Sequence, residues 1–414
     1  MAVIGLVHQN PFFPHVFEAA AHKGHKLVHL ASPHDNFVNR FFPGVIASHD
    51  LDIFADEEKA IAEATSIRER YGIEGFISFR EEAMPFTARL CDRLGMSSIS
   101  PEAAEQARDK RRMRQAFQRH GVRCPKFVRC TVEDWRARFE SAQIPFPVVV
   151  KPTLGFGSIG VIEAGDMASL AAAVEQAQVI IRKKLSKFTS QPEFLIEQFI
   201  GGGEYIVDSV CHLGKAHIVG LAYKGIPRGP YFEERFHLTM PPLQAEVLQD
   251  VYVQVSGALA ALGISEGPSH TEIKIEGDKT YIIEVGARIG GSGQVHWLVE
   301  ESTGVDFLGL TFDHCLGRLD TTGLTPIAQA KACVSNYNIR AGGGGVFREI
   351  GGLVQAARTA PPQRFIFMWQ PGFKVTPYPD FCGFPGFILS KHVDFETGLG
   401  DIERYDREVV VQYD

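Results

Sequence analysis

The sequence predicts a protein of mixed α/β and α+β class, with an open parallel α/β domain first and a β-rich subdomain last. Three observations support this class. Apolar runs alternate with amphipathic stretches over the first hundred residues, which favours a parallel sheet with crossover helices. Alternating runs joined by turns follow from about residue 147, as in antiparallel hairpins. Glycine and proline then become frequent from about residue 325 and separate short strand-like runs.

The N-terminal elements follow from the periodicity of their apolar residues. We expect strands at 2–7, 26–30 and 75–78, and helices at 14–23 and 57–71. A further helix starts after Ser100, which is a favoured N-cap residue, with Pro101 in the first helical position. We therefore assign residues 1–104 to the first domain.

The central part combines strands and helices in an α+β order. The expected strands are 147–151, 161–162, 194–198, 207–211 and 216–223, and the expected helices are 167–184 and 244–262. We divide this part into a smaller lobe at 105–204 and a larger lobe at 205–325. Residues 326–414 form the C-terminal β-rich subdomain.

Composition narrows the classes of function. A chain of 414 residues exceeds one hydrophobic core, and 45% hydrophobic with 22% charged residues is an ordinary globular composition. No apolar run approaches membrane-spanning length. A net charge of -7 gives no indication of the positive surface that binds nucleic acid. The seven cysteines form no CxxC pair and read as buried thiols. We expect a cytoplasmic protein with small-molecule partners, no nucleic acid and no membrane, and a homodimer stays open as an alternative to a monomer.

Two glutamates carry the most informative pattern. Glu272 and Glu284 lie in two alternating runs separated by Gly277-Asp278, a hairpin turn that brings both carboxylates to one sheet. Two such carboxylates suit Mg²⁺ that bridges nucleotide phosphates, and Arg288 can neutralise charge on a transferring phosphoryl group. Taken alone, alternating Glu and Lys on a hairpin also fits a solvated face.

A glycine-rich segment runs from Gly155 to Gly160 and matches G-x-G-x-x-G. A dinucleotide fingerprint must open a helix, whereas here Val161 resumes a strand before the next helix begins. We therefore interpret the segment as a strand–loop–strand flap whose backbone amides can approach phosphates. A purely structural glycine hairpin is the alternative.

Two lysines and one strand end accompany this flap. Lys151 ends an apolar run, where a charge is costly unless it meets an anion. Lys110 lies in a basic helical stretch, and a solvated basic face is its local alternative. The apolar strand at 194–198 leads into glycines and Glu204, so its end can offer backbone groups to an adenine edge and a carboxylate to ribose hydroxyls.

Taken in order, these residues resemble the ATP-grasp carboxylate–amine ligases over about residues 105–320. The resemblance implies an ATP-grasp fold, with ATP and Mg²⁺ as cofactors and Mn²⁺ as an alternative metal. It implies that Lys110 and Lys151 bind phosphate and that Glu272 and Glu284 bind the metal. It also implies that Arg288 binds an acyl phosphate. The nucleotide residues that it further implies are Gly155, Gly157, Ser158 and Gly160 in the lid, Glu197, Phe199 and Ile200 in the adenine hinge, and Glu204 at the ribose.

Within that superfamily, the segment 284–291 and the segment around His270 look most like the L-amino acid ligases, which form dipeptides. One departure is Gly286, where many members have an asparagine that completes the second metal site. The implied reaction activates a carboxylate as an acyl phosphate and joins it to an amine. The alternatives are a ligase of nucleotide or cofactor biosynthesis and a non-catalytic ATP-binding module.

Other candidate residues surround this set. His270 shares a strand face with Glu272 and can touch substrate or assist proton removal, or simply pack. Candidate substrate contacts are Arg228, Gly291, His296 and Trp297, and the alternative for His296 and Trp297 is simple packing on a helix. Arg228 can also be a solvated loop residue. The histidines at 22, 25 and 29 lack steady spacing across a helix-to-strand change, which disfavours a metal site there.

Overall fold

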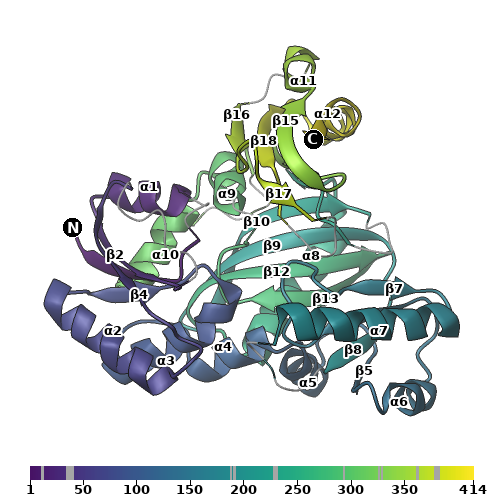
Figure 1. The fold of residues 1–414 in the computed structure, drawn as a ribbon, viewed down its shortest axis with the longest axis horizontal. Helices are drawn as coiled ribbons and strands as arrows, with labels where there is room; N and C mark the ends of the chain where they lie inside the picture. The colour runs from purple at the N-terminus through teal and green to yellow at the C-terminus, as the bar shows by residue number, and fades with distance from the viewer. Residues whose placement is uncertain are drawn as a thin grey trace.

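The computed structural model describes the whole chain except residues 11–13, 34–41, 187–188, 190–192, 227–231, 292–293, 325–326, 328–329, 360–362 and 377–382. Four sheets organise the described residues. In Figure 1 the N-terminal sheet lies at the left, a long twisted sheet crosses the centre, a small helix-covered sheet lies at the lower right, and the C-terminal strands rise at the top.

The N-terminal sheet is parallel, with strand order β3-β2-β1-β4. Its elements are β1 (Val3–Val7), α1 (His15–His22), β2 (Lys26–Ala31), β3 (Val45–Asp50), α2 (Glu57–Tyr71), β4 (Gly75–Ile77), a 3₁₀ turn (Glu81–Ala83) and α3 (Met84–Leu94). The predicted strands and helices are confirmed, whereas β3 and α3 were not predicted. Asp56 caps α2 by accepting a hydrogen bond from the Lys59 amide.

The helix predicted after Ser100 is real but shorter than expected. Ser100 caps it as predicted, yet the chain breaks at Asp109, which has extended backbone angles and caps a second helix through the Arg111 amide. The two helices are α4 (Pro101–Arg108) and α5 (Lys110–His120). The break places Lys110 at the first position of α5, where its side chain is only 4% exposed. The solvated basic face is therefore wrong for Lys110.

The smaller central sheet is antiparallel, with strand order β5-β8-β6-β7. Its elements are β5 (Phe127–Cys130), α6 (Trp135–Ala142), β6 (Val148–Pro152), β7 (Ile162–Ala164), α7 (Met167–Lys184) and β8 (Phe194–Gln198). The glycine-rich segment joins β6 to β7 as a hairpin and opens no helix, which confirms the flap geometry. Helix α7 covers this sheet in Figure 1.

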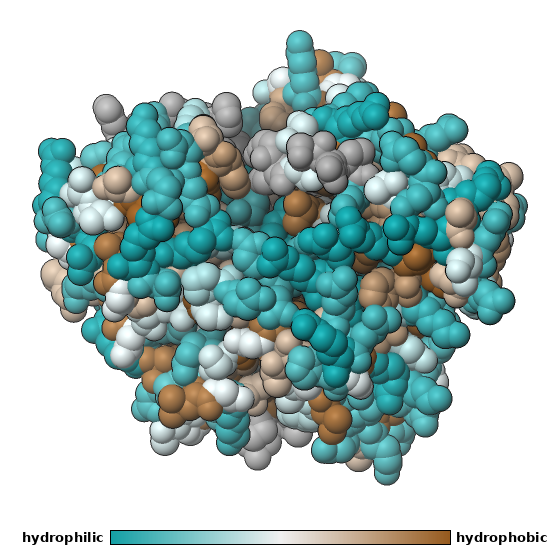
Figure 2. Space-filling model, turned by 90° about the horizontal axis from the view of Figure 1, so that it is seen from below, coloured by the Kyte–Doolittle hydropathy of each residue, from teal (hydrophilic) through white to brown (hydrophobic). Residues whose placement is uncertain are grey.

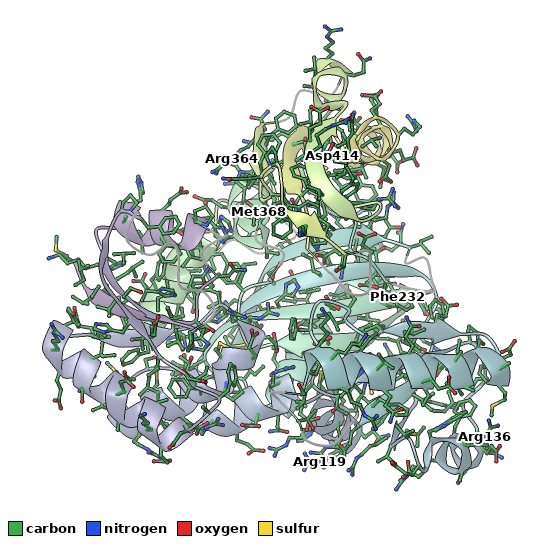
Figure 3. The ribbon with its side chains drawn as sticks, viewed as in Figure 1. Arg119, Arg136, Phe232, Arg364, Met368 and Asp414 are labelled. Carbon is green, nitrogen blue, oxygen red and sulfur yellow. The ribbon has the colours of Figure 1, made fainter. Side chains whose placement is uncertain are left out.

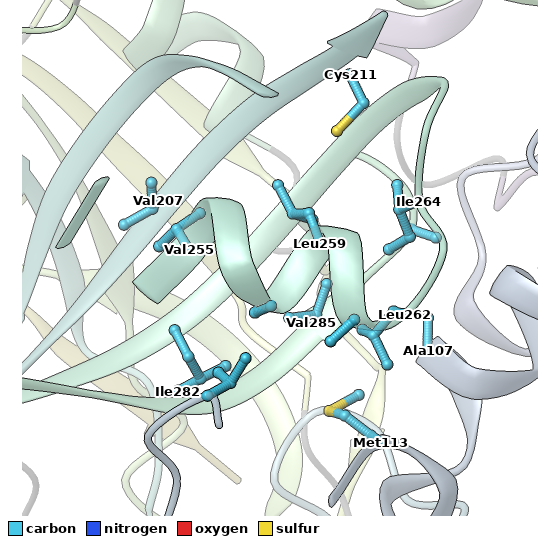
Figure 4. Close-up of a cluster of buried hydrophobic side chains, with 14 of the residues drawn as sticks. Ala107, Met113, Val207, Cys211, Val255, Leu259, Leu262, Ile264, Ile282 and Val285 are labelled. Atoms are coloured by element: carbon cyan, nitrogen blue, oxygen red, sulfur yellow. The ribbon is translucent and has the colours of Figure 1, made fainter. Parts of the chain in front are cut away.

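The long sheet has the order β13-β12-β9-β10-β11-β14-β18-β16. Its first part comprises β9 (Gly203–His212), β10 (Lys215–Gly225), β11 (Phe236–Thr239), α8 (Ala245–Ala261), β12 (Gly267–Glu276) and β13 (Lys279–Gly286), followed by α9 (Val295–Thr303) and α10 (Phe307–Cys315). Helix α8 buries Val255 and Leu259 against Val207 and Ile282 of the sheet (Figure 4). This core fixes the face of the sheet on which α8 lies, and with it the direction of alternate side chains.

The C-terminal strands extend the same long sheet. They comprise β14 (Cys333–Ile339), β16 (Arg364–Phe367) and β18 (Gly386–His392), while β15 (Gly345–Gly351), β17 (Lys374–Val375) and β19 (Val410–Tyr413) form a separate small sheet beside α11 (Leu353–Thr359) and α12 (Phe395–Glu408). The β-rich character is as predicted. The division of the chain at 104, 204 and 325 stays a prediction.

A buried polar chain ties α12 to this sheet. The Ser335 Oγ lies 2.8 Å from His392 Nε2, and His392 Nδ1 lies 2.9 Å from Asp401 Oδ2. The residue types match a catalytic triad, but Ser335 is 0% exposed in the middle of the sheet. Substrate has no access to its hydroxyl, so the chain of contacts is structural.

The surface is mainly hydrophilic on the face shown in Figure 2, where apolar side chains are scattered among polar ones. Of the six described cysteines, Cys124 is half-buried and the others are buried, and Cys382 lies outside the described residues. Among the described helices, none has both the length and the apolar composition needed to cross a bilayer.

Candidate active site

The two predicted metal-binding glutamates face each other across neighbouring strands. Glu272 on β12 pairs in register with Glu284 on β13, after the predicted turn at Gly277-Asp278. Lys110 Nζ lies 2.6 Å from Glu284 Oε1, and Lys224 Nζ lies 3.2 Å from Glu272 Oε1. The hairpin prediction is confirmed, and each carboxylate has a lysine as counter-ion.

Lys224 lies among three carboxylates. Its ammonium is 2.7 Å from Glu204, 3.2 Å from Glu272 and 3.3 Å from Glu234. Burial alone would lower the pKa of Lys224, but the charges of Glu204, Glu272 and Glu234 outweigh it and raise the pKa well above its usual value. Lys224 therefore remains a cation and can bind an anion beside these carboxylates.

Lys151 ends β6 and is almost fully buried. Its Nζ lies 2.6 Å from Glu197 Oε2, and Arg114 Nε lies 2.7 Å from the other oxygen of the same carboxylate. Burial lowers the pKa of Lys151, and Glu197 only partly opposes this effect. The Glu197 side chain is thus engaged by two cations and its backbone pairs with β5 and β6, so its role in the adenine hinge stays a prediction.

The glycine-rich lid is anchored at its first residue. The carbonyl of Gly155 accepts hydrogen bonds from Arg108 Nη1 and Lys110 Nζ, both at 3.1 Å. Gly157 and Ser158 have φ of 56° and 57°, and Gly160 has φ of 75°. This left-handed backbone favours glycine and turns the peptide groups of the lid away from strand pairing. Backbone amides in such a turn can bind phosphate oxygens.

The predicted adenine hinge lies at the end of β8 and in the residues that follow it. The amides of Gln198 and Phe199 already donate to backbone carbonyls, whereas the Ile200 amide has no acceptor among the described residues. The Ile200 carbonyl accepts a 2.9 Å hydrogen bond from Lys274 Nζ, which lies 4.3 Å from the Phe199 ring centroid. Phe232, labelled in Figure 3, stacks near Phe199 at 6.4 Å. Aromatic rings beside an unpaired amide suit a purine base.

Arg288 follows β13 and makes an ion pair with the N-terminal domain. Its Nη2 lies 2.6 Å from Oε2 of Glu81, which begins the 3₁₀ turn after β4. The same Glu81 oxygen would lie 3.1 Å from a Cβ added at Gly286. An asparagine in place of Gly286 would therefore lie next to Glu81. Its side chain would disturb the Glu81–Arg288 ion pair.

His270 is held in one orientation. Its Nδ1 lies 2.8 Å from Asp208 Oδ1 on β9, and its ring packs against Gly290, where an added Cβ would approach it to 2.7 Å. The carboxylate fixes the ring and leaves Nε2 as the nitrogen that can act on a substrate. Packing and a chemical role are thus compatible for this residue.

The predicted substrate contacts divide into three groups. Gly291 lies next to Arg288, and a Cβ at Gly291 would be 3.5 Å from Arg288 Nη1. His296 and Trp297 lie half-buried in the first turn of α9, and His296 stacks on His15 of the N-terminal domain. Arg228 lies outside the described residues.

The sequence analysis missed five charged residues of the site. They are Glu81, Arg114, Asp208, Lys224 and Glu234. Lys224 had a usable signal, because it follows an apolar run in the way that Lys151 does. The others meet their partners only through contacts between distant elements.

The donor set fits a divalent cation that is shared with a phosphate. Glu272 and Glu284 supply hard oxygen ligands, and Mg²⁺ commonly takes one or two carboxylates together with phosphate oxygens. Within the described ranges no group of three or more His, Cys, Asp or Glu side chains is arranged to hold a metal by itself. The pair would therefore hold Mg²⁺ jointly with a bound nucleotide.

Comparison with known proteins agrees with this geometry. Residues 144–296 match the model of the ATP-grasp domain, and residues 17–97 match the ATP-grasp N-terminal domain. The crystal structure of an L-amino acid ligase from Bacillus licheniformis superposes with a TM-score of 0.91 at 31% identity, covering 100% of this chain and 99% of that one.

Curated relatives match over shorter spans. Alanine–anticapsin ligase of Bacillus subtilis is 28% identical over 279 residues, which is 63% of this chain and 58% of that protein. Carnosine synthase 1 of Homo sapiens is 27% identical over 313 residues, 71% of this chain and 37% of that protein. The chain thus matches little more than half the length of the first of these relatives and less of the second. Full-length similarity to the L-amino acid ligase structure and the two domain matches show that this chain belongs to the ATP-grasp family.

Proposed function

We propose that this protein is an ATP-dependent ligase that activates a carboxylate, most simply of an amino acid, as an acyl phosphate and joins it to an amine such as a second amino acid. The products would be a dipeptide or a dipeptide-like amide, ADP and phosphate. The main observation behind the proposal is that three lysines near the glycine lid each contact a glutamate. Lys110, Lys151 and Lys224 each contact a carboxylate in the same region.

This arrangement suits exchange of counter-ions on nucleotide binding. The lysines are now neutralised by protein carboxylates, so a polyphosphate can take over the lysines while a cation takes over the carboxylates. Both sets of charges remain compensated in either state. Mg²⁺ held by Glu272 and Glu284, with Mn²⁺ as an alternative, would supply charge neutralisation at the transferring phosphoryl group.

The residues support two chemical steps. In the first, a carboxylate oxygen of the donor bonds to the γ-phosphorus, and the bond from that phosphorus to the β-bridging oxygen breaks to release ADP. Lys110, Lys151 and Lys224 stabilise the phosphate charge, and Arg288 holds the acyl phosphate. Closure of the lid at 155–160 excludes water, which would otherwise hydrolyse the intermediate.

In the second step the amine nitrogen bonds to the acyl carbon, and the carbon–oxygen bond to phosphate breaks. The attacking amine must lose a proton, and His270 Nε2 would take it; the contact of Asp208 with the opposite ring nitrogen supports this role. Arg288 then releases inorganic phosphate. Each protein group thus binds, orients or accepts a proton.

The test is a phosphate-release screen over pairs of amino acids and small carboxylic acids, with mass spectrometry of the products. We expect release that needs Mg²⁺, ATP and both substrates together, and a product mass equal to the two substrates less one water. ATP hydrolysis at the same rate without any carboxylate would contradict the ligase. A ligase of nucleotide or cofactor biosynthesis would instead leave every amino acid pair without product.

A further inference from the structure

Two imidazole rings from distant parts of the chain stack on each other beside the proposed substrate site. His15 is the first residue of α1 and His296 is the second residue of α9. Their ring centroids are 4.3 Å apart and their planes differ by 12°. Both residues are half-buried.

The topology places this pair at a ligand-binding edge. The chain passes from β1 to β2 and β3 on one side, and β4 lies on the other side of β1. Ligands of open parallel sheets bind at such a reversal, outside the carboxyl ends of the strands. The segment after β1 leads into His15, and the 3₁₀ turn after β4 carries Glu81, which contacts Arg288. The Glu81–Arg288 pair and the imidazole stack thus each contain a residue that follows the carboxyl end of one of these two strands.

A third group comes from the C-terminal part of the chain. Arg364 begins β16, the edge strand of the long sheet, and Figure 3 shows it on the side of the C-terminal strands that faces the N-terminal domain. Burial and then the charge of Arg364 lower the pKa of His296 to about 4. Burial, His296 and Arg364 lower the pKa of His15 well below its usual value. Arg364 is exposed.

These properties favour a negatively charged ligand. A neutral imidazole carries one ring N–H donor, and one guanidinium supplies a single positive charge with several donors. Both imidazoles also lie in the first turn of a helix, where the backbone adds partial positive charge. A metal cation would meet repulsion from Arg364. The Arg364 guanidinium would instead neutralise the charge of a carboxylate and donate hydrogen bonds to it.

We propose that His15, His296 and Arg364 form the subsite for the free carboxylate of the amine substrate. The inference rests on the proposed ligase function, in which Arg288 serves the activated carboxylate and leaves the second carboxylate without an assigned partner. It implies that the acceptor is an amino acid rather than a simple amine. A site built to pair a charged group discriminates strongly against an analogue that lacks it.

The test compares acceptor amino acids with their carboxamides, which keep the amine and lose the negative charge. Equilibrium binding of a panel of common amino acids and the matching carboxamides is measured with Mg²⁺ and a non-hydrolysable ATP analogue, in the unmodified protein and in Arg364→Gln. Arg364→Lys keeps the charge. Arg348→Gln is the matched control, because Arg348 is an exposed arginine of the same subdomain, on β15.

We expect the unmodified protein to prefer at least one acid over its amide, and Arg364→Gln to reduce this preference by tenfold or more. Arg364→Lys should retain most of the preference, and Arg348→Gln should retain all of it. An acid-to-amide ratio that is unchanged in Arg364→Gln overturns the subsite. Binding needs no turnover, so failure of the screen for ligase products would refute the proposed function separately, whatever this ratio shows.

Discussion

Replacement of Glu197 by Gln tests the buried charges beneath the proposed phosphate site. The Glu197 carboxylate is 1% exposed, and it contacts Arg114, which is 0% exposed, and Lys151, which is 5% exposed. Burial would raise the pKa of Glu197, but Arg114 and Lys151 outweigh it and lower the pKa, so the carboxylate is charged at neutral pH. Glutamine keeps the shape and removes the charge.

The size of the effect follows from this burial. Loss of one partner of a buried ion pair costs about 3–5 kcal/mol, because the remaining charge stays in a poor solvent. Here two cations lose their shared carboxylate. Lys151 can relieve part of the cost by releasing its proton, since burial already lowers its pKa. We therefore expect a loss near 4 kcal/mol, a large part of the roughly 5–15 kcal/mol that holds a typical domain folded.

The assay is urea unfolding at pH 7.5 followed by circular dichroism, with hydrogen exchange to locate the change in β6 and β8. Glu193→Gln is the matched control, because Glu193 precedes the same strand and pairs with Arg129, whose side chain is 45% exposed. That pair should contribute about 1 kcal/mol or less. Equal losses in the two variants, or a Glu197→Gln loss below about 1 kcal/mol, would refute the reasoning.

Three other substitutions probe the metal, the lid and acid stability. Glu284→Gln removes a proposed metal ligand, and turnover should fall by roughly two orders of magnitude; near-normal activity would place the metal elsewhere. Gly157→Val forces a branched side chain into a residue with φ of 56°, so turnover should fall while ATP affinity changes less, and tight NADH binding by the unmodified protein would instead favour a dinucleotide site. Burial lowers the pKa of His314 to about 4, so the unfolded chain takes up a proton at this residue before the folded protein does. The free energy of unfolding therefore falls as pH falls from about 6.5 towards 4. Between pH 7 and pH 5 the unmodified protein should lose about 2 kcal/mol more than His314→Gln in urea unfolding, and equal losses would count against this cause.

Local patterns predicted the elements that depend on neighbouring residues. The turn at Gly277-Asp278 predicted the hairpin of β12 and β13, whereas the β-bulge between Glu272 and Ile273, which brings Glu272 opposite Glu284, was not predicted. The strand after Gly160 was likewise enough to separate a flap from a dinucleotide fingerprint. Sequence alone could make these predictions because hairpin geometry is set within a few residues.

The remainder depended on contacts between distant segments. Asp109 interrupts a stretch whose composition favours one continuous helix, and only its cap on Arg111 explains why Lys110 turns inward. The partners of Lys224 come from three other parts of the chain, 204, 234 and 272. The local pattern gave no partner for the side chain of Glu197, whereas in the structure it contacts Arg114 and Lys151. Charge pairing over such separations is decided by packing, which the periodicity of one strand does not encode.

The most direct test of the central claim follows the oxygen atoms of the activated carboxylate. The donor substrate found in the screen is labelled with ¹⁸O in both carboxylate oxygens and allowed to react with ATP, Mg²⁺ and the amine. An acyl phosphate transfers one labelled oxygen to inorganic phosphate and leaves the other in the amide, so mass spectrometry should find one ¹⁸O in each product. Unlabelled phosphate, or label in AMP, would contradict the account.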